Sequence, residues 1–197
     1  MKKIVIRTLV VATLLFIQNA CTTVNAQQLD NFNVSISQNG EEKNIVNNTV
    51  TLQKKEFAIV VHFSQPMTLL VSAALNDKTY KPATKQKPLD ELPAFINPGA
   101  MAETMFNKDK EILLSDDSPS NWYYDSIDDH RFNSIHIDEN GITAEREIEN
   151  LYDVIKKETI PISDVKKPLY LVFVSCKYND KKERTEIHRQ YMEIKWE

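Results

Sequence analysis

Apolar and polar residues alternate one by one early and late in this 197-residue chain, and this pattern constrains the fold more than any other feature. Phe32, Val34 and Ile36 alternate with polar residues, and the segment 185–196 alternates in the same way. A period of two places every second side chain on one face of an extended strand. The pattern therefore predicts half-buried β-strands in both parts of the chain.

Turn signals separate the expected strands. Asn39-Gly40 and Asn140-Gly141 are pairs in which both residues tolerate positive φ, as tight hairpin turns require. The apolar run 169–176 is followed by a polar turn and then by the late alternating segment. We therefore expect one long antiparallel hairpin over 169–196. The run 57–63 predicts a further strand with its odd-numbered side chains on one face.

The middle of the chain, about 82–165, has a different texture. Three prolines open it, and Met101 and Met105 favour a short helix over 100–110. After the Asn140-Gly141 turn, we expect a short strand over 142–146 followed by a helix. The helix is predicted because apolar residues recur at i, i+3, i+4 and i+7 from Ile148 to Ile155. The sequence thus predicts a mixed α/β insertion between early and late strands.

In strand pattern the chain resembles the immunoglobulin-like β-sandwiches, with short strands separated by turns about every 8 to 12 residues. The Cys–Trp–Cys signature of antibody domains is missing, so the resemblance implies sandwich architecture alone. We expect residues 27–197 to form a single, mainly β domain, a β-sandwich with the inserted segment about 82–165.

The first 26 residues predict an export signal. Lys2, Lys3 and Arg7 form a basic start, an apolar run follows over 9–17, and Val24-Asn25-Ala26 supplies the small residues that a signal peptidase needs. The apolar run is shorter than the roughly 20 residues that span a bilayer. We expect cleavage after Ala26 and a location in the periplasm or at the surface of a bacterial cell.

Ala20-Cys21 offers a second cleavage point, at which Cys21 would carry a lipid anchor as in bacterial lipoproteins. That class usually has Leu three residues before the cysteine, and Gln18 stands there in this chain, so cleavage after Ala26 is favoured. With Cys21 lipidated, the protein would be an outer-membrane lipoprotein. This anchor is the only membrane contact that the sequence predicts.

Removal of the signal leaves 21 basic and 28 acidic residues, a net charge of −7, because the signal holds three basic residues and no acidic one. A nucleic-acid-binding protein normally has a basic excess, so we expect no nucleic-acid partner. The one remaining cysteine, Cys176, lies in the apolar run 169–176 and is expected to be a buried apolar side chain. Only Gly40, Gly99 and Gly141 are present, which excludes glycine-rich nucleotide loops, and no cofactor is predicted.

Three consecutive aromatic residues, Trp122, Tyr123 and Tyr124, are followed by Asp125 within a polar segment. Trp and Tyr are enriched in binding hot spots, and their rings also stack on sugars. The cluster predicts a binding face for a protein or a glycan. The alternative is that these aromatic side chains anchor the middle segment onto the sandwich.

His130 and His136 lie among aspartates that include Asp125 and Asp138. Imidazole and carboxylate groups are metal ligands, so the two histidines are weak metal-site candidates. A separation of six residues across a loop does not fix a coordination geometry. A solvated acidic loop is therefore the favoured interpretation, and we predict no metal.

The sequence contains no P-loop, no GxSxG motif and no HExxH motif, which favours a non-enzymatic protein. Our first hypothesis is an exported binding module of the bacterial cell envelope, with a protein or glycan partner. The first alternative is a periplasmic immunity or inhibitor protein, whose acidic charge would complement a basic toxin. The second is an envelope hydrolase that uses His130, His136 and nearby aspartates.

Overall fold

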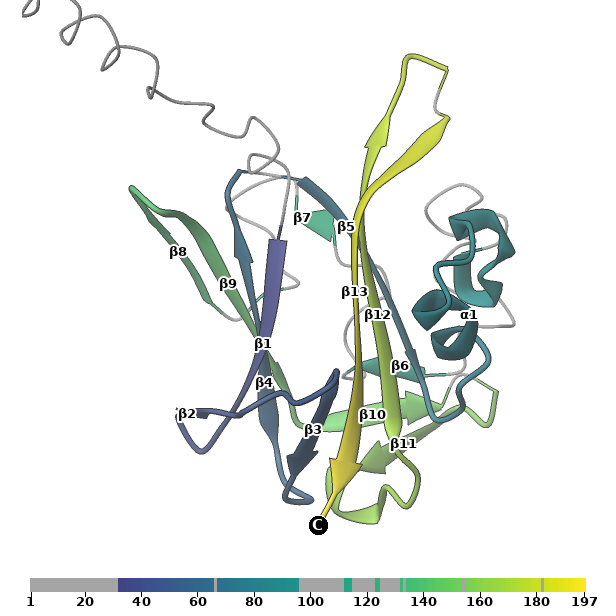
Figure 1. Ribbon diagram of the computed structural model, residues 1–197. Coiled ribbons are helices and arrows are strands. Elements are labelled where there is room, and N and C mark those ends of the chain that lie inside the picture. Colours follow the sequence, from purple (N-terminus) through teal and green to yellow (C-terminus); the bar gives the residue numbers. More distant parts are fainter. Residues whose placement is uncertain are drawn as a thin grey trace, which may run out of the picture.

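The computed structural model describes residues 32–65, 67–95, 112–114, 123–124, 132, 134–153, 155–181 and 183–197. Most of these residues lie in strands of two sheets (Figure 1). The helical elements are the short helix α1 (Tyr80–Thr84) and 3-10 turns at Leu89–Glu91, Pro93–Phe95 and Ile162–Asp164. The prediction of a mainly β fold is confirmed. Within these ranges no helix has the length and apolar character needed to cross a bilayer.

The first sheet has five strands and is antiparallel throughout. In spatial order these are β2 (Glu41–Glu42), β1 (Phe32–Gln38), β4 (Phe57–Phe63), β9 (Gly141–Ile148) and β8 (Ser134–Asp138). β2 has two residues and pairs only with Ser37 and Gln38 of β1. Among the described strands, the rest of β1 therefore has no partner on the side away from β4.

The second sheet has eight strands. In spatial order these are β11 (Glu158–Pro161), β10 (Asn150–Asp153), β6 (Ile112–Leu114), β5 (Met67–Ala74), β12 (Leu169–Tyr178), β13 (Arg184–Trp196) and β3 (Thr49–Leu52), with β7 (Tyr123–Tyr124) also paired to β5. β3 pairs with β13 in parallel, and the other pairs are antiparallel. The two sheets together exceed the about seven to nine strands of immunoglobulin-like sandwiches, and that finer resemblance is not confirmed.

One apolar core lies between the two sheets. The side chains of Phe57, Ile59, Val61 and Phe63 on β4 are at most 3% exposed, as their shared face predicted. They belong to the same buried cluster as Leu171 and other side chains of the second sheet. Alternate side chains of β1 and β4 therefore build the core.

β12 is buried on both faces, which explains its unbroken apolar sequence. Leu171 and Phe173 point into the core between the sheets, whereas Val172 and Val174 pack with buried side chains of the segment 83–95. Figure 1 shows this segment, with α1, covering the outer face of the second sheet. Cys176 belongs to this second cluster and is buried, as predicted.

The three hairpin predictions are confirmed. Asn39 and Gly40 have φ of 58° and 75° in the turn between β1 and β2. Asn140-Gly141 joins β8 to β9, and residues 179–183 join β12 to β13. A β-bulge at Ser175/Cys176 interrupts the long hairpin.

The helix predicted after residue 146 is wrong. β9 continues to Ile148, and β10 starts at Asn150 in the other sheet. Ile148 and Leu151 are both fully buried because the chain crosses from one sheet to the other between them. Ile155, which the helical pattern would have buried, is 67% exposed. The i, i+3 spacing thus results from a corner between two strands.

The middle segment contains both helical turns and strands, in keeping with a mixed α/β insertion. Its strands are built into both sheets, because β6, β7, β10 and β11 join the second sheet and β8 and β9 join the first. The helix predicted over 100–110 lies outside the described residues.

Candidate binding site

The predicted aromatic face lies largely outside the described residues. Trp122 and Asp125 are not described, and Tyr123 and Tyr124 are described as backbone only. Their strand, β7, pairs with Met67 and Thr68 of β5. The expectation that Trp122, Tyr123, Tyr124 and Asp125 form a binding face therefore stays a prediction, as does lipidation of Cys21.

His136 lies exposed on β8, and its Nε2 is 3.7 Å from Oδ2 of Asp138. The other oxygen of Asp138 accepts a hydrogen bond of 2.7 Å from the backbone N–H of Asn140, so this carboxylate stabilises the turn. His130 lies outside the described residues. In the part of the chain that the structure describes, no three His, Cys, Asp or Glu side chains form a group that could hold a metal ion.

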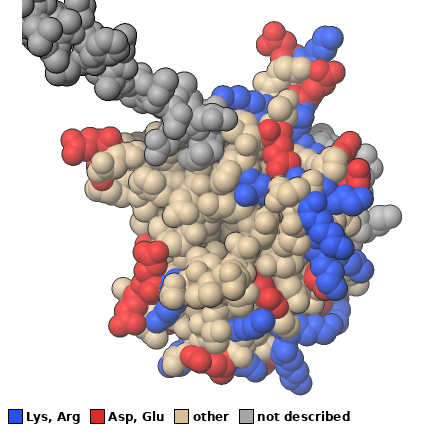
Figure 2. Space-filling view, viewed as in Figure 1, with Lys and Arg blue, Asp and Glu red and all other residues tan. Residues whose placement is uncertain are grey.

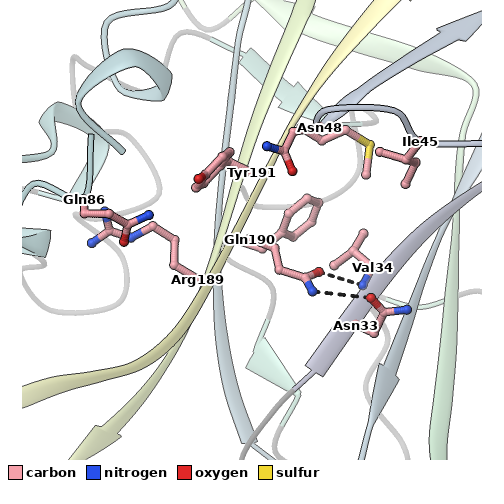
Figure 3. Close-up of a pocket in the computed structure, with 10 residues that line it drawn as sticks. Asn33, Val34, Ile45, Asn48, Gln86, Arg189, Gln190 and Tyr191 are labelled. Carbon is pink, nitrogen blue, oxygen red and sulfur yellow. Dashed lines mark hydrogen bonds between the residues drawn. The ribbon is translucent and has the colours of Figure 1, made fainter. Parts of the chain in front are cut away.

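The structure brings other polar residues together at a cavity of about 350 Å³, which lies along the part of β13 that β3 does not cover. We call this cavity the amide hollow, because side-chain amides of Asn33, Asn48, Gln86 and Gln190 line it, together with Tyr191. Figure 3 shows these side chains, which come from β1, the loop before β3, the turn after α1, and β13. A shallow groove of about 390 Å³ also borders β1, and Asn33, Val34 and Ile45 line both spaces.

The hollow exists because β3 covers only part of β13. β3 pairs with β13 over Glu193–Trp196, and the backbone N–H of Glu193 donates to the carbonyl of Asn48 at 2.8 Å. The chain reaches β13 through a tight turn just before β3, in which Asn47 and Asn48 have φ of 50° and 59°. Among the described strands, none pairs with Arg184–Met192 on the side away from β12. The first half of β13 therefore has an open edge beside the hollow.

Gln190 joins the two sheets at the hollow. Its Oε1 accepts a hydrogen bond of 2.8 Å from the backbone N–H of Val34 on β1. Its Nε2 donates to the carbonyl of Phe32 and to Oδ1 of Asn33, each at 3.4 Å. These bonds fix the distance between β1 and β13 and hold the carboxamide of Gln190 in place (Figure 3).

Arg189 fixes the opposite wall. Its guanidinium forms a two-pronged ion pair with Glu186, with N–O distances of 2.8 and 2.5 Å. It also donates to the backbone carbonyls of Lys87 at 2.9 Å and Ala83 at 3.3 Å, which ties β13 to the turn after α1. The Arg189 side chain is 5% exposed. Its charge is thus neutralised inside the wall of the hollow.

Gln86 directly follows Lys85, the C-cap residue of α1, and has a left-handed backbone conformation at φ 57°. The backbone N–H of Gln86 donates to the carbonyl of Ala83, and that of Lys87 donates to the carbonyl of Pro82. Glycine is the usual residue at such a position, because it has no Cβ. In this chain the position instead presents an exposed carboxamide at the rim.

Tyr191 is held by a chain of tyrosines on the outer face of the second sheet. Its ring lies edge-on to Tyr80, with centroids 5.9 Å apart, and Tyr80 packs on Tyr170 at 5.0 Å. Burial, and secondarily the negative charge of Glu193, raise the pKa of Tyr80 above its usual 10.0, so its hydroxyl stays protonated at neutral pH. The result is a fixed aromatic wall at one side of the hollow.

The sequence analysis missed the amide hollow, because its residues converge from four distant segments. One signal was available. The alternation in 185–196 places Gln190 on the same face as Met192 and Ile194, which are 5% and 0% exposed. A carboxamide on a core-facing row needs hydrogen-bond partners, and such positions often mark a functional or bridging role.

Comparison with known proteins gives no family assignment: no protein-family model matches the chain, and no curated protein is significantly similar to it.

Proposed function

We propose that this protein is an exported, non-enzymatic binding module of the bacterial cell envelope, and that its partner binds at the amide hollow. The observation that carries the proposal is a cavity of about 350 Å³ with walls held by the side-chain bonds of Gln190 and Arg189. Small-molecule and cofactor sites are typically preformed cavities of about 300–1,000 Å³ with a few fixed polar groups. The amide hollow has these properties.

The chemistry of the lining favours recognition over catalysis. Carboxamides donate and accept hydrogen bonds but do not exchange protons at physiological pH. The guanidinium of Arg189 is engaged by Glu186 and by two backbone carbonyls, so it positions the wall. The neighbouring His188 packs edge-on to Phe32, with ring centroids 5.1 Å apart. These groups support binding of a partner without chemical change.

The envelope location is proposed from the basic and apolar start of the chain, with cleavage after Ala26 or lipidation at Cys21. Mass spectrometry of the protein isolated from cells distinguishes the two. A mature chain that starts at Gln27 supports a soluble exported protein, and an acylated Cys21 supports an outer-membrane lipoprotein. A protein that keeps residues 1–26 overturns the proposed export.

Binding is tested by sedimentation with isolated bacterial envelopes. Asn33→Trp places a large ring at the mouth of the hollow on an exposed position of β1, and Thr51→Trp is the matched control on an exposed position of β3 outside the hollow. We expect wild type and Thr51→Trp to sediment with envelopes and Asn33→Trp to remain in solution. Equal sedimentation of both variants, or no sedimentation of wild type, contradicts the proposal.

A further inference from the structure

We infer that the amide hollow binds a neutral glycan, with one sugar ring seated against its floor. This inference rests on the proposed binding function and specifies the ligand. Four features of the described residues support it: the carboxamides, the apolar floor, the neutral charge and the shortness of the open strand edge.

The carboxamides at the rim suit adjacent hydroxyl groups. Each offers a hydrogen-bond donor and an acceptor side by side, and each sugar hydroxyl likewise both donates and accepts. Within the described part of the chain, the side chains of Asn48 and Gln86 have no hydrogen-bond partner, and both are exposed at the hollow. They are therefore available to a ligand, whereas Gln190 is held by β1.

The floor of the hollow is apolar. Val34 and Met192, each 5% exposed, form its accessible part, and the fully buried Phe173 backs them. Tyr191 adds an aromatic wall fixed by Tyr80. A sugar ring has a face of C–H groups and a rim of hydroxyls, so an apolar floor with carboxamides beside it matches both parts of it.

The lining is neutral, which selects an uncharged ligand. Arg189 is the one charged side chain among the residues that line the hollow, and its ion pair with Glu186 leaves no free cation there. Figure 2 shows the same neutrality on a larger scale, with the middle of this face largely uncharged and charged side chains mostly at its margins. A phosphate or an acidic sugar would therefore lose its hydration without gaining a charged partner.

The rival occupant is an extended peptide that adds a strand to the open edge of β13. Because the N–H of Glu193 points to this edge and successive residues alternate, Tyr191 and Arg189 direct their backbone groups to it as well. The bulge at Ser175/Cys176 then changes the register, so only Arg189 and Tyr191 direct backbone groups to the regular part of the open edge. Strand addition depends on a longer row of backbone bonds, and the carboxamides favour the glycan.

Two variants remove the carboxamides without disturbing the fold. Asn48→Gly and Gln86→Gly replace residues with φ of 59° and 57°, where glycine is unstrained. Asn39→Gly is the matched control, because Asn39 has φ 58° in a turn that does not line the hollow. All three variants are expected to unfold at or above the wild-type temperature.

The probes are maltohexaose, cellohexaose, xylohexaose and mannohexaose, each titrated calorimetrically into the purified protein. An oligogalacturonate serves as the acidic comparison and a neutral Ser/Thr octapeptide as the extended one. We expect one or more of the neutral hexasaccharides to bind with one-to-one stoichiometry. Loss of one hydrogen bond should weaken binding about fivefold in Asn48→Gly and in Gln86→Gly, and Asn39→Gly should bind as wild type does.

Three results overturn the inference: no neutral hexasaccharide binds, the acidic sugar or the peptide binds more tightly, or Asn48→Gly and Gln86→Gly bind as wild type does. The envelope experiment separates these failures from failure of the proposed function. If Asn33→Trp abolishes sedimentation while no neutral sugar binds, the binding module stands and the glycan assignment falls. If wild type neither sediments nor binds sugar, both fall.

Discussion

The side chain of Gln190 on β13 accepts a hydrogen bond of 2.8 Å from the backbone N–H of Val34 on β1. A side chain of the eight-stranded sheet thus takes the place of a neighbouring strand for the five-stranded sheet. Edge strands present unpaired backbone groups, and proteins protect them in various ways. Here one carboxamide protects an edge and lines the amide hollow at the same time.

Gln190→Ala should lower the free energy of unfolding by about 1–3 kcal/mol, because Val34 is 5% exposed and its N–H would lose its acceptor. Gln190→Glu keeps an acceptor for that N–H but loses the donor to Phe32 and Asn33, and it should recover part of the loss. Urea unfolding followed by circular dichroism measures both. An unchanged unfolding midpoint in Gln190→Ala would show that the bond contributes nothing to stability.

Gly141→Ala should be far more destabilising than Gly40→Ala. Both glycines have positive φ, +129° and +75°, so each alanine adds backbone strain. At Gly141 the new Cβ would also collide with the backbone carbonyl of Phe63, whereas at Gly40 it would meet no atom within 4 Å. We expect a loss of about 1 kcal/mol at Gly40 and about 3 kcal/mol or more at Gly141. Equal thermal unfolding temperatures for the two variants would contradict the close approach of β4 and Gly141.

The thiol of Cys176 should be inert in the folded protein. Burial raises its pKa to about 12, so at pH 8 it is protonated as well as shielded. Protein that starts at Gln27 should give no fast reaction with Ellman's reagent, and one thiol per chain once guanidinium has unfolded it. Fast labelling of the native protein would show that the cluster formed by β12 and the segment 83–95 opens readily.

Stability should fall on mild acidification in part through His188. Burial lowers its pKa below the usual 6.5, and Glu186 only partly offsets this shift. The unfolded chain therefore takes up a proton before the folded one does. The contribution of His188 is complete above pH 6.5 and is lost as the pH falls from 6.5 through the lowered pKa of the folded state.

His188→Phe removes this titration while keeping a ring against Phe32. The difference in unfolding free energy between wild type and variant should be constant from pH 7 to 8. Below pH 6.5, the unfolding free energy of the wild type should fall relative to that of the variant. Urea titrations at several pH values measure it. A difference that stays constant down to pH 5 would mean that His188 has the same pKa in the folded and the unfolded chain.

The strands and turns were predictable because their signals are local. The alternation of Phe57, Ile59, Val61 and Phe63 gave the buried face of β4, and the Asn-Gly pairs gave two turns. The segment after residue 146 failed for a physical reason: Ile148 and Leu151 enter the same core from different sheets, and this corner has the spacing of a helical turn.

The amide hollow was not predictable in the same way. Asn33, Asn48 and Gln86 are ordinary polar residues, and no local pattern distinguishes them from the other amides of the chain; Gln190 alone has a local signal, its place on a core-facing row. They converge because β3 pairs in parallel with β13 and because Gln190 reaches β1. Such pairings between residues far apart in the sequence are invisible to a short window. The aromatic cluster at Trp122 remains a separate prediction.

The pairing of Thr49–Leu52 with Glu193–Trp196 also determines when the fold can be completed during synthesis. Until Arg184–Trp196 has left the ribosome, β3 has no strand to pair with, β12 lacks one neighbour and the amide that protects β1 is missing. Contacts that close such long loops form slowly. The pairings of β3 and β12 with β13, and the bond from Gln190 to β1, therefore form only after nearly all of the chain has been synthesised.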